Sequence, residues 1–529
     1  MAVFVSAREA AEKVKDRAVI GYSAFLGYAN ADDVMGAIQA RFIETGHPNG
    51  LTLIKGVSNG DGNEKGSNRL AVPGLMERVI TSHIGVEPKV SQIIQENQCL
   101  GYAVSLGAVT ELFRAAASHR PGVFTSSGLA TFLDPRLEGG KLNSLTRDSG
   151  EDIVFLKELD GKEWLYYPVI PVDVAIVRGT YADEDGNIAM DKEAVSCDAF
   201  EAAAAAHNNG GIVIAQVERI VKRGSLPPRL VVLHHFMVDY VVEGTEDGQT
   251  QCYGADGKYH PEWTGEAPMP LKALPALPLN DRKICGRRAA MELTSGSLVN
   301  LGIGMPESVA AVAAEEGVAA EITLSVESGA LGGVPRSGLG LGGTVNPEAF
   351  YKTADILNIY DGGGLDMTVL GMAEVDKDGN VNVSKFGDKL VGPGGFIDIS
   401  QNTGTVVFTG TFTAGGLKTS YEGGAWHLLQ EGHSVKFKNA VSQITFSGSY
   451  ARQKRQNVLI VTERAVFRLA DDGWMLTEIA PGADLERDVL RQMEFRPRIA
   501  KDLKLMDGRI FRDEPMGLAL KKAQKKMKK

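Results

Sequence analysis

The stretch Ile322-Thr-Leu-Ser-Val-Glu-Ser-Gly-Ala-Leu-Gly-Gly-Val-Pro335 decides the local fold around one carboxylate. Its first five residues alternate apolar and polar side chains, which predicts a strand with one buried face. The glycines that follow allow sharp turns and a close approach of a ligand to the backbone, and Pro335 ends the turn. Glu327 lies at the carboxyl end of this strand, where open α/β sheets have their ligand crevices. Glu327 is therefore the predicted catalytic residue, and a solvated loop glutamate is the alternative.

The size and composition of the chain describe an ordinary globular protein. The chain has 529 residues, of which 43% are hydrophobic and 23% charged, and this length predicts roughly two to four domains. The formal net charge is -10. Because phosphate contacts need a basic surface, this charge argues against nucleic acid as a partner.

The cysteines and the chain ends indicate a cytoplasmic location. Cys99, Cys197, Cys252 and Cys285 are widely spaced, so they predict neither a metal site nor a disulfide framework. The sequence shows no apolar run long enough for a membrane span and no signal-peptide pattern at its start, so no membrane association is expected. The lysine-rich end, residues 521–529, is typical of a solvated tail.

A weak internal repeat predicts two similar halves. Residues 6–38 read as a capped helix followed by strand, small-residue turn and helix, and residues 282–312 repeat this order. Between them, residues 243–278 are rich in glycine, proline and polar side chains, as in a linker. The predicted fold is α/β, with two homologous open α/β domains at residues 1–270 and 280–515, a basic tail at 516–529, and the active site between the domains.

Further elements of the first half follow from apolar runs. We expect strands at residues 51–54, 169–178 and 211–217, with Pro171 marking an edge or the entry of the second. We expect helices at residues 75–80 and 109–119.

With Glu327 and the two halves in place, the chain resembles the family I CoA-transferases of the short-chain acyl-CoA:carboxylate type, which act on acetate, propionate and 3-ketoacids. The resemblance runs from about residue 17 to 515 and rests on six segments in the same order. These segments are residues 178–187, 300–306, 326–335, 365–380, 392–398 and 461–468.

The resemblance implies the substrates and the site. Acyl-CoA and small carboxylic acids would be the partners, no cofactor or metal would be needed since the CoA thioester is a substrate, and the protein would form a homo-oligomer, a dimer or tetramer. Glu327 would be the catalytic glutamate. The resemblance also implies that Gly394 and Gly395 lie on the loop that approaches CoA and that Gly302 and Gly304 line the floor of the site. Gly392 and Lys418 are further expected CoA-binding residues, Lys418 through a phosphate, with a solvated surface lysine as its alternative.

The chemistry of a carboxylate fits this activity independently. An ionised glutamate can attack an acyl-CoA thioester and form a mixed anhydride. CoA thiolate then attacks the glutamyl carbonyl and remains on Glu327 as a thioester, and an incoming carboxylate reverses both steps in a ping-pong cycle. Each tetrahedral intermediate carries an oxyanion that needs fixed N–H donors, such as those of the glycine turns.

One position departs from the family pattern. Relatives carry Pro-Gln-Gly where this chain has Ser105-Leu106-Gly107, and the family's glutamine is thought to assist the oxyanion. Leu106 in that place predicts a more apolar acceptor pocket, unless Leu106 is a core residue behind the pocket.

Three other functions compete with the transferase. An acyl-CoA hydrolase on the same scaffold would release its product without a carboxylate acceptor, and a catalytically inactive CoA-sensing protein would bind without turnover. A dinucleotide dehydrogenase is disfavoured because Gly302-Ile-Gly304 lacks the third glycine of that motif.

Overall fold

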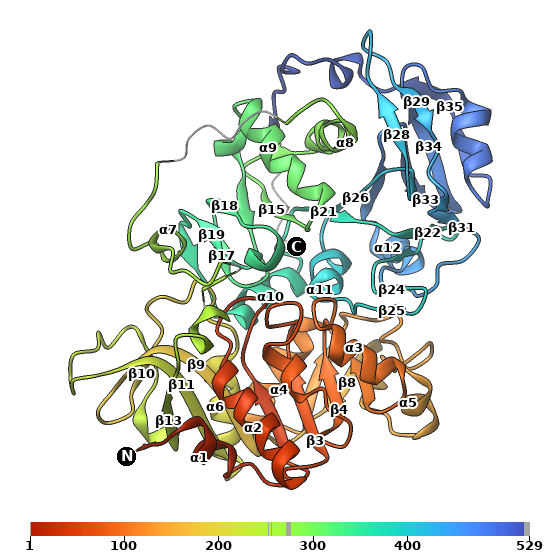
Figure 1. Cartoon of the computed structure of the whole chain (residues 1–529). Helices are drawn as coiled ribbons and strands as arrows, with labels where there is room; N and C mark the ends of the chain where they lie inside the picture. Colours follow the sequence, from red (N-terminus) through yellow and green to blue (C-terminus); the bar gives the residue numbers. More distant parts are fainter. Residues whose placement is uncertain (1, 252, 255, 271–276, 523–529) are drawn as a thin grey trace.

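The computed structural model describes residues 2–251, 253–254, 256–270 and 277–522. Cys252, Pro275 and residues 523–529 of the predicted tail lie outside these ranges. The chain builds two large sheets, one from strands between residues 3 and 243 and one from strands between residues 298 and 505. Figure 1 shows the first half, in red to yellow, packed below the second half, in green to blue.

The first sheet has a parallel main path. Its strands follow the order β1 (Val3–Phe4), β13 (Tyr240–Glu243), β11 (Ile212–Val221), β9 (Val174–Asp183), β2 (Val19–Tyr22), β3 (Leu51–Lys55), β4 (Met76–Thr81) and β5 (Leu100–Ala103). Each pair of neighbours on this path is parallel. The short strands β10 (Ile188–Ala189) and β12 (Val231–Leu233) add antiparallel pairs beside β9.

The helices of the first half lie around this sheet. They are α1 (Ala7–Ala11), α2 (Asp32–Thr45), α3 (Pro88–Gln95), α4 (Leu106–Ala117), α5 (Ser144–Asp148) and α6 (Ala199–Asn208). Strand β9 is almost wholly buried, as expected for a parallel strand whose two faces are both covered. A separate small sheet joins β6 (Gly122–Thr125), β8 (Lys162–Pro168) and β7 (Phe155–Leu159).

The second sheet has a parallel centre flanked by antiparallel pairs, and its last pair, formed by the two C-terminal strands, is parallel again. Its order is β20 (Ala349–Phe350), β17 (Ala330–Leu331), β16 (Thr323–Ser325), β15 (Leu298–Leu301), β21 (Met367–Gly371), β26 (Thr405–Thr409), β32 (Asn457–Val461), β33 (Ala465–Ala470), β34 (Gly473–Ile479) and β35 (Arg498–Leu505). The strands from β16 to β32 are parallel. The helices of this half are α8 (Asp281–Ala290), α9 (Ser308–Glu315), α10 (Thr353–Asp361), α11 (Phe396–Gln401) and α12 (Gly448–Lys454).

The predicted α/β fold class is confirmed, and so are several local patterns. Ser6 and Glu9 form the expected capping box at the start of α1. Strand β9 begins at Val174 rather than near residue 169, since Pro171 cannot contribute an N–H group to the sheet. The domain boundaries stay a prediction, although the segment between the two sheets does contain the short helix α7 (Pro261–Thr264).

The predicted helix at residues 75–80 is wrong, because this segment is strand β4. Val79, Ile80 and Thr81 are all buried in succession, and β4 pairs with β3 on one side and β5 on the other. A short apolar run in the middle of a parallel sheet has no alternation to distinguish it from a helix.

The helices offer no candidate for a membrane span. Within the described residues, none combines the length and the apolar character that crossing a bilayer requires.

Candidate active site

Glu327 lies on a tight turn that joins two strands of the second sheet. Strand β16 ends at Ser325 and β17 begins at Ala330, and the Val326 N–H donates to Ala330 O at 3.0 Å across the turn. Gly329 has φ 117°, and a methyl group there would lie 1.9 Å from Tyr351 O. Only glycine fits this place, so the turn that presents Glu327 is fixed by its neighbours.

The surroundings of Glu327 make its carboxylate more basic. Burial raises the pKa of Glu327 above its ordinary value, while its own backbone N–H and the nearby Asn300 amide lower it in part. Asn300 comes from the adjacent strand β15, and its Nδ2 donates to Ser325 O at 3.1 Å. Because desolvation disfavours the charged form, the ionised carboxylate is held in a high-energy, reactive state.

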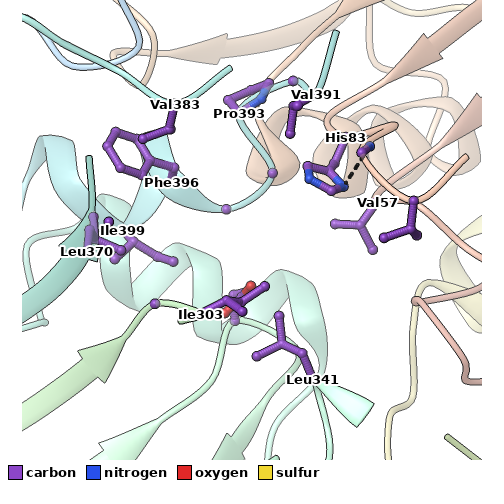
Figure 2. A pocket seen from close by; sticks show the side chains of 18 of the residues that line it. Val57, His83, Ile303, Leu341, Leu370, Val383, Val391, Pro393, Phe396 and Ile399 are labelled. Atoms are coloured by element: carbon purple, nitrogen blue, oxygen red, sulfur yellow. Dashed lines mark hydrogen bonds between the residues drawn. The ribbon is translucent and has the colours of Figure 1, made fainter. Parts of the chain in front are cut away.

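Glu327 faces a cavity of about 460 Å³ that both halves line. The first half contributes loops after β2, β3 and β4, and the second half contributes the ends of β15 and β21 and the segment before α11. Figure 2 shows apolar side chains on all sides, among them Val57 from the first half and Ile303, Leu370 and Phe396 from the second. The polar side chains of the lining are His83, Asn300, Glu327 and Lys389.

Residues 392–395, here called the glycine loop, form one wall of the cavity. Gly392 has φ 82°, and a methyl group there would lie 2.4 Å from Ser82 O. The Gly394 N–H donates to the same oxygen at 2.9 Å. A methyl group on Gly395 would lie 3.1 Å from Glu327 Cγ. The glycine loop therefore lies between the first half, at Ser82, and Glu327.

The two glycines after β15 differ in their relation to the cavity. Gly302 belongs to its lining, and a methyl group there would lie 3.1 Å from Leu370 Cδ2. Gly304 has φ 85° and precedes the short turn η4 (Met305–Glu307). It lies one residue beyond the lining residues Gly302 and Ile303.

Lys418 and Leu106 lie apart from the described lining. Lys418 is exposed at the start of β28 (Lys418–Ser420), in the upper part of the second half in Figure 1. Leu106 is 1% exposed, and its Cδ1 would lie 3.0 Å from a methyl group on Gly56. Leu106 thus packs behind the wall that Val57 forms, and the roles predicted for both residues stay predictions.

Sequence reasoning missed His83, which the loop after β4 contributes to the cavity. His83 follows strand β4, and because that strand was expected to be a helix, the place of His83 at the carboxyl end of a parallel strand was hidden. Strand ends in this sheet are where ligands bind, so a correct strand assignment is the signal that would have found it.

A second pair of carboxylates lies buried where the halves meet. Asp361 ends α10 and Asp398 lies in α11, and a methyl group on Gly107 of α4 would lie 3.0 Å from Asp361 Oδ2 and 2.8 Å from Asp398 Oδ1. Ser127 Oγ donates to Asp361 Oδ1 at 2.6 Å. Burial raises the pKa of Asp398 to about 6. Burial and the negative charge of Asp398 raise the pKa of Asp361 as well.

We expect Asp361→Asn to stabilise the protein at pH 8 more than at pH 5. Carboxylates with raised folded-state pKa values contribute stability below their unfolded pKa, and this contribution is lost as the pH rises through the raised values, about 6 for Asp398. Removing one of the two charges should raise the free energy of unfolding at pH 8 by about 1–3 kcal/mol. Thermal unfolding at both pH values measures this. Asp355→Asn, which alters an exposed carboxylate of the same helix, is the control, and a destabilised Asp361→Asn at pH 8 would contradict the account.

Comparison with known proteins gives one consistent result. The family described as Coenzyme A transferase matches residues 5–244 and 283–487. Caffeate CoA-transferase of Acetobacterium woodii is 43% identical over 525 residues, covering 98% of this chain and 99% of the relative. Acetate CoA-transferase YdiF of Escherichia coli K12 is 40% identical over 522 residues, covering 98% of this chain and 97% of the relative. The crystal structure of acyl-CoA transferase YdiF from E. coli O157:H7 in a thioester complex with CoA superposes with a TM-score of 0.91 at 39% identity, covering 99% of this chain and 98% of that one.

Proposed function

The chain belongs to the coenzyme A transferase family, and we propose that it moves CoA from an acyl-CoA to a free carboxylate through a thioester formed on Glu327. The observation that carries this proposal is the position of Glu327, on a fixed turn facing a cavity that both halves line. The raised pKa of Glu327 and the absence of a side chain at Gly395 beside it suit a nucleophile held close to a backbone that a ligand can approach.

The first half-reaction loads CoA onto the protein. The Glu327 carboxylate attacks the thioester carbonyl, the C–S bond breaks, and CoA leaves as a thiolate while a mixed anhydride remains. The thiolate then attacks the glutamyl carbonyl of that anhydride. The donor acid leaves as a carboxylate, and CoA stays bound to Glu327 through a new C–S bond.

The second half-reaction returns CoA to a new acid. The acceptor carboxylate attacks the glutamyl thioester and releases CoA thiolate, and the thiolate attacks the acyl carbonyl of the new anhydride. The product acyl-CoA forms and Glu327 is again a free carboxylate. No net proton transfer is needed, so the main task of the protein is to hold the groups in position and to stabilise each oxyanion.

The cavity supports the binding of both substrates. We propose that Gly302, Gly392, Gly394 and Gly395 approach CoA from the lining, with Gly304 next to it. Lys418 would bind a CoA phosphate only if the chain of CoA extends to β28. The apolar lining keeps water away from the thioester, which favours transfer over the alternative hydrolase activity.

A panel of acids tests the proposed function. The protein is incubated with acetyl-CoA and, separately, with propionate, butyrate, 3-ketoacids and aromatic propenoic acids, and the acyl-CoA products are identified by mass. We expect new acyl-CoA only when an acceptor is present. Release of free CoA at the same rate without any acceptor would favour a hydrolase, and binding without turnover would favour a CoA-sensing protein.

We expect Leu106→Gln to shift relative kcat/KM toward acetate and propionate by severalfold, because the change places an amide directly behind the Val57 wall of the cavity. Burying an amide without a partner should also cost about 1–3 kcal/mol of stability. The same panel of acids and a thermal melt measure the two effects. An unchanged acceptor profile together with lowered stability would mean that Leu106 contributes to core packing and not to acceptor selection.

Assembly as a homo-oligomer, a dimer or tetramer, is part of the same proposal. Light scattering on the purified protein measures it.

A further inference from the structure

His83 is the polar side chain that the first half contributes to the cavity among the described residues. Figure 2 shows its ring projecting from the first half near Val57, with Ile303 and Leu341 on the opposite side. The proposed transfer steps use no histidine, so the contacts of the His83 ring indicate what it can do.

The contacts of Nδ1 determine which ring nitrogen carries the hydrogen. The Gly85 N–H donates to Nδ1 at 3.4 Å, and Ser58 Oγ lies 2.8 Å from Nδ1. Ser58 Oγ itself accepts the Val86 N–H at 3.3 Å, which leaves its hydroxyl hydrogen free to point at the ring. Both contacts fit an unprotonated Nδ1 that accepts, so the hydrogen of a neutral imidazole is on Nε2.

The Nε2 edge of the His83 ring lies next to Gly85, which has no side chain to cover it. A methyl group on Gly85 would lie 2.8 Å from Nε2 and 3.0 Å from Val391 Cγ1. Gly85 does not have a left-handed φ, so its backbone conformation does not require glycine. Within the described part of the chain Nε2 has no hydrogen-bond partner. The absence of a side chain at residue 85 keeps the Nε2 edge of the ring accessible.

Backbone hydrogen bonds hold His83 against the glycine loop. The Ile84 N–H donates to Val391 O at 2.8 Å, and the Gly394 N–H donates to Ser82 O at 2.9 Å. A methyl group on Gly394 would lie 3.8 Å from His83 Cδ2, and one on Gly395 would lie 3.1 Å from Glu327 Cγ. Consecutive Cα atoms are about 3.8 Å apart. The ring and the carboxylate therefore flank neighbouring residues of one loop and line the same cavity.

The charges around His83 keep it neutral. Burial in the cavity wall, then the positive charges of Lys55 and Lys389, lower the pKa of His83 to about 4. Lys55 comes from β3, donates to His83 O at 3.1 Å and pairs with Glu87 at 2.9 Å. Lys389 comes from β25 (Lys389–Leu390) and lines the cavity with Glu327. A neutral imidazole can donate a hydrogen bond without losing its proton.

We propose that His83 is a catalytic hydrogen-bond donor, whose Nε2–H binds the acyl oxygen that becomes the oxyanion when Glu327 or CoA thiolate attacks. The inference rests on the proposed function. It adds a side-chain donor to the backbone N–H groups of a cavity whose lining is otherwise mostly apolar. Ser58 and Gly85 act as positioning residues, the first by orienting the ring and the second by leaving Nε2 accessible.

Three variants test this role through the rate at which acyl-CoA forms the Glu327 thioester in a single turnover. His83→Phe keeps a ring but removes the donor, and we expect a loss of about 10²-fold or more, with a larger change in kcat than in KM. His83→Gln returns an N–H donor and should recover about 10-fold of this loss. Gly85→Ala keeps the histidine but covers Nε2, and should also slow the reaction. His427→Phe, at an exposed histidine of β29 (His427–Gln430), is the matched control.

A wild-type rate in His83→Phe, or equal losses in His83→Phe and His83→Gln, would overturn the proposal. Histidine labelled with ¹⁵N gives a measurement that does not depend on the folding of variants: we expect an unprotonated Nδ1 and a protonated Nε2 from pH 6 to 8, and the opposite tautomer would also overturn it. If the wild-type protein forms no thioester, the proposed function fails first and this inference with it. If the wild-type protein forms the thioester and the variants do so equally fast, only the inference fails.

Discussion

Replacing Glu327 with glutamine is expected to lower CoA transfer by about 10⁴-fold or more, because the nucleophile is removed while the shape of the side chain is kept. The turn that carries residue 327 is fixed by Gly329 and by the backbone hydrogen bond from Val326 N–H to Ala330 O. Neither involves the side chain of residue 327, so the variant should fold. Acyl-CoA should still bind, since the cavity lining is otherwise unchanged. Transfer rates and acyl-CoA affinity, measured on the same preparation, separate chemistry from binding.

The same variant should be more stable than the wild-type protein at pH 8. The pKa of Glu327 is raised in the folded state, so its contribution to stability is present below the unfolded pKa and is lost as the pH rises through the raised value. Glutamine carries no charge and avoids this loss, and the gain should shrink toward pH 4. Glu321→Gln, at an exposed glutamate of η5 (Ala319–Glu321), is the control. Equal losses of transfer and of acyl-CoA binding in Glu327→Gln would mean that Glu327 serves binding.

The second large effect is expected from Gly395→Val. Gly395 has φ -80°, a conformation open to any residue, so the change does not strain the backbone. Even a methyl group there would lie 3.1 Å from Glu327 Cγ and 3.2 Å from Ile399 Cδ1. Valine should push the carboxylate out of position, and a displacement on the order of 1 Å costs about 10²-fold in rate.

Gly508→Val provides the matched control for this prediction. A methyl group on Gly508 meets no atom within 4 Å, so the same substitution there should leave the transfer rate unchanged. The initial rate with a saturating donor and acceptor measures both variants. A wild-type rate in Gly395→Val would mean that the glycine loop does not limit the position of Glu327.

The fold class and the position of Glu327 could be predicted because local patterns decide them. Alternation from Ile322 to Val326 gives the strand, and Gly329 allows the tight turn that carries Glu327. The rest of the predicted turn is wrong in part, because it contains the short strands β17 and β18 (Val334–Pro335). The strand β4 could not be predicted in the same way. Its apolar residues are buried between two parallel neighbours, and this arrangement removes the alternation on which strand prediction depends.

The walls of the cavity depend on contacts between residues far apart in the sequence. Ser82 O accepts a hydrogen bond from Gly394 N–H, and no pattern in either segment predicts this pairing. The place of Leu106 behind Val57, and the exposure of Lys418 on β28, likewise follow from how the chain packs. A family motif can therefore identify which residues belong to such a site, but it does not give the distances between them in the folded protein.

The most direct test of the account is to locate the covalent bond to CoA. The protein is incubated with acyl-CoA without an acceptor, treated with borohydride, digested and analysed by mass spectrometry, with Glu327→Gln as the control. We expect a single peptide, the one that contains Glu327, to carry the reduced side chain, and the control to carry none. A modified residue elsewhere, or transfer at the wild-type rate with no modification at Glu327, would contradict the account.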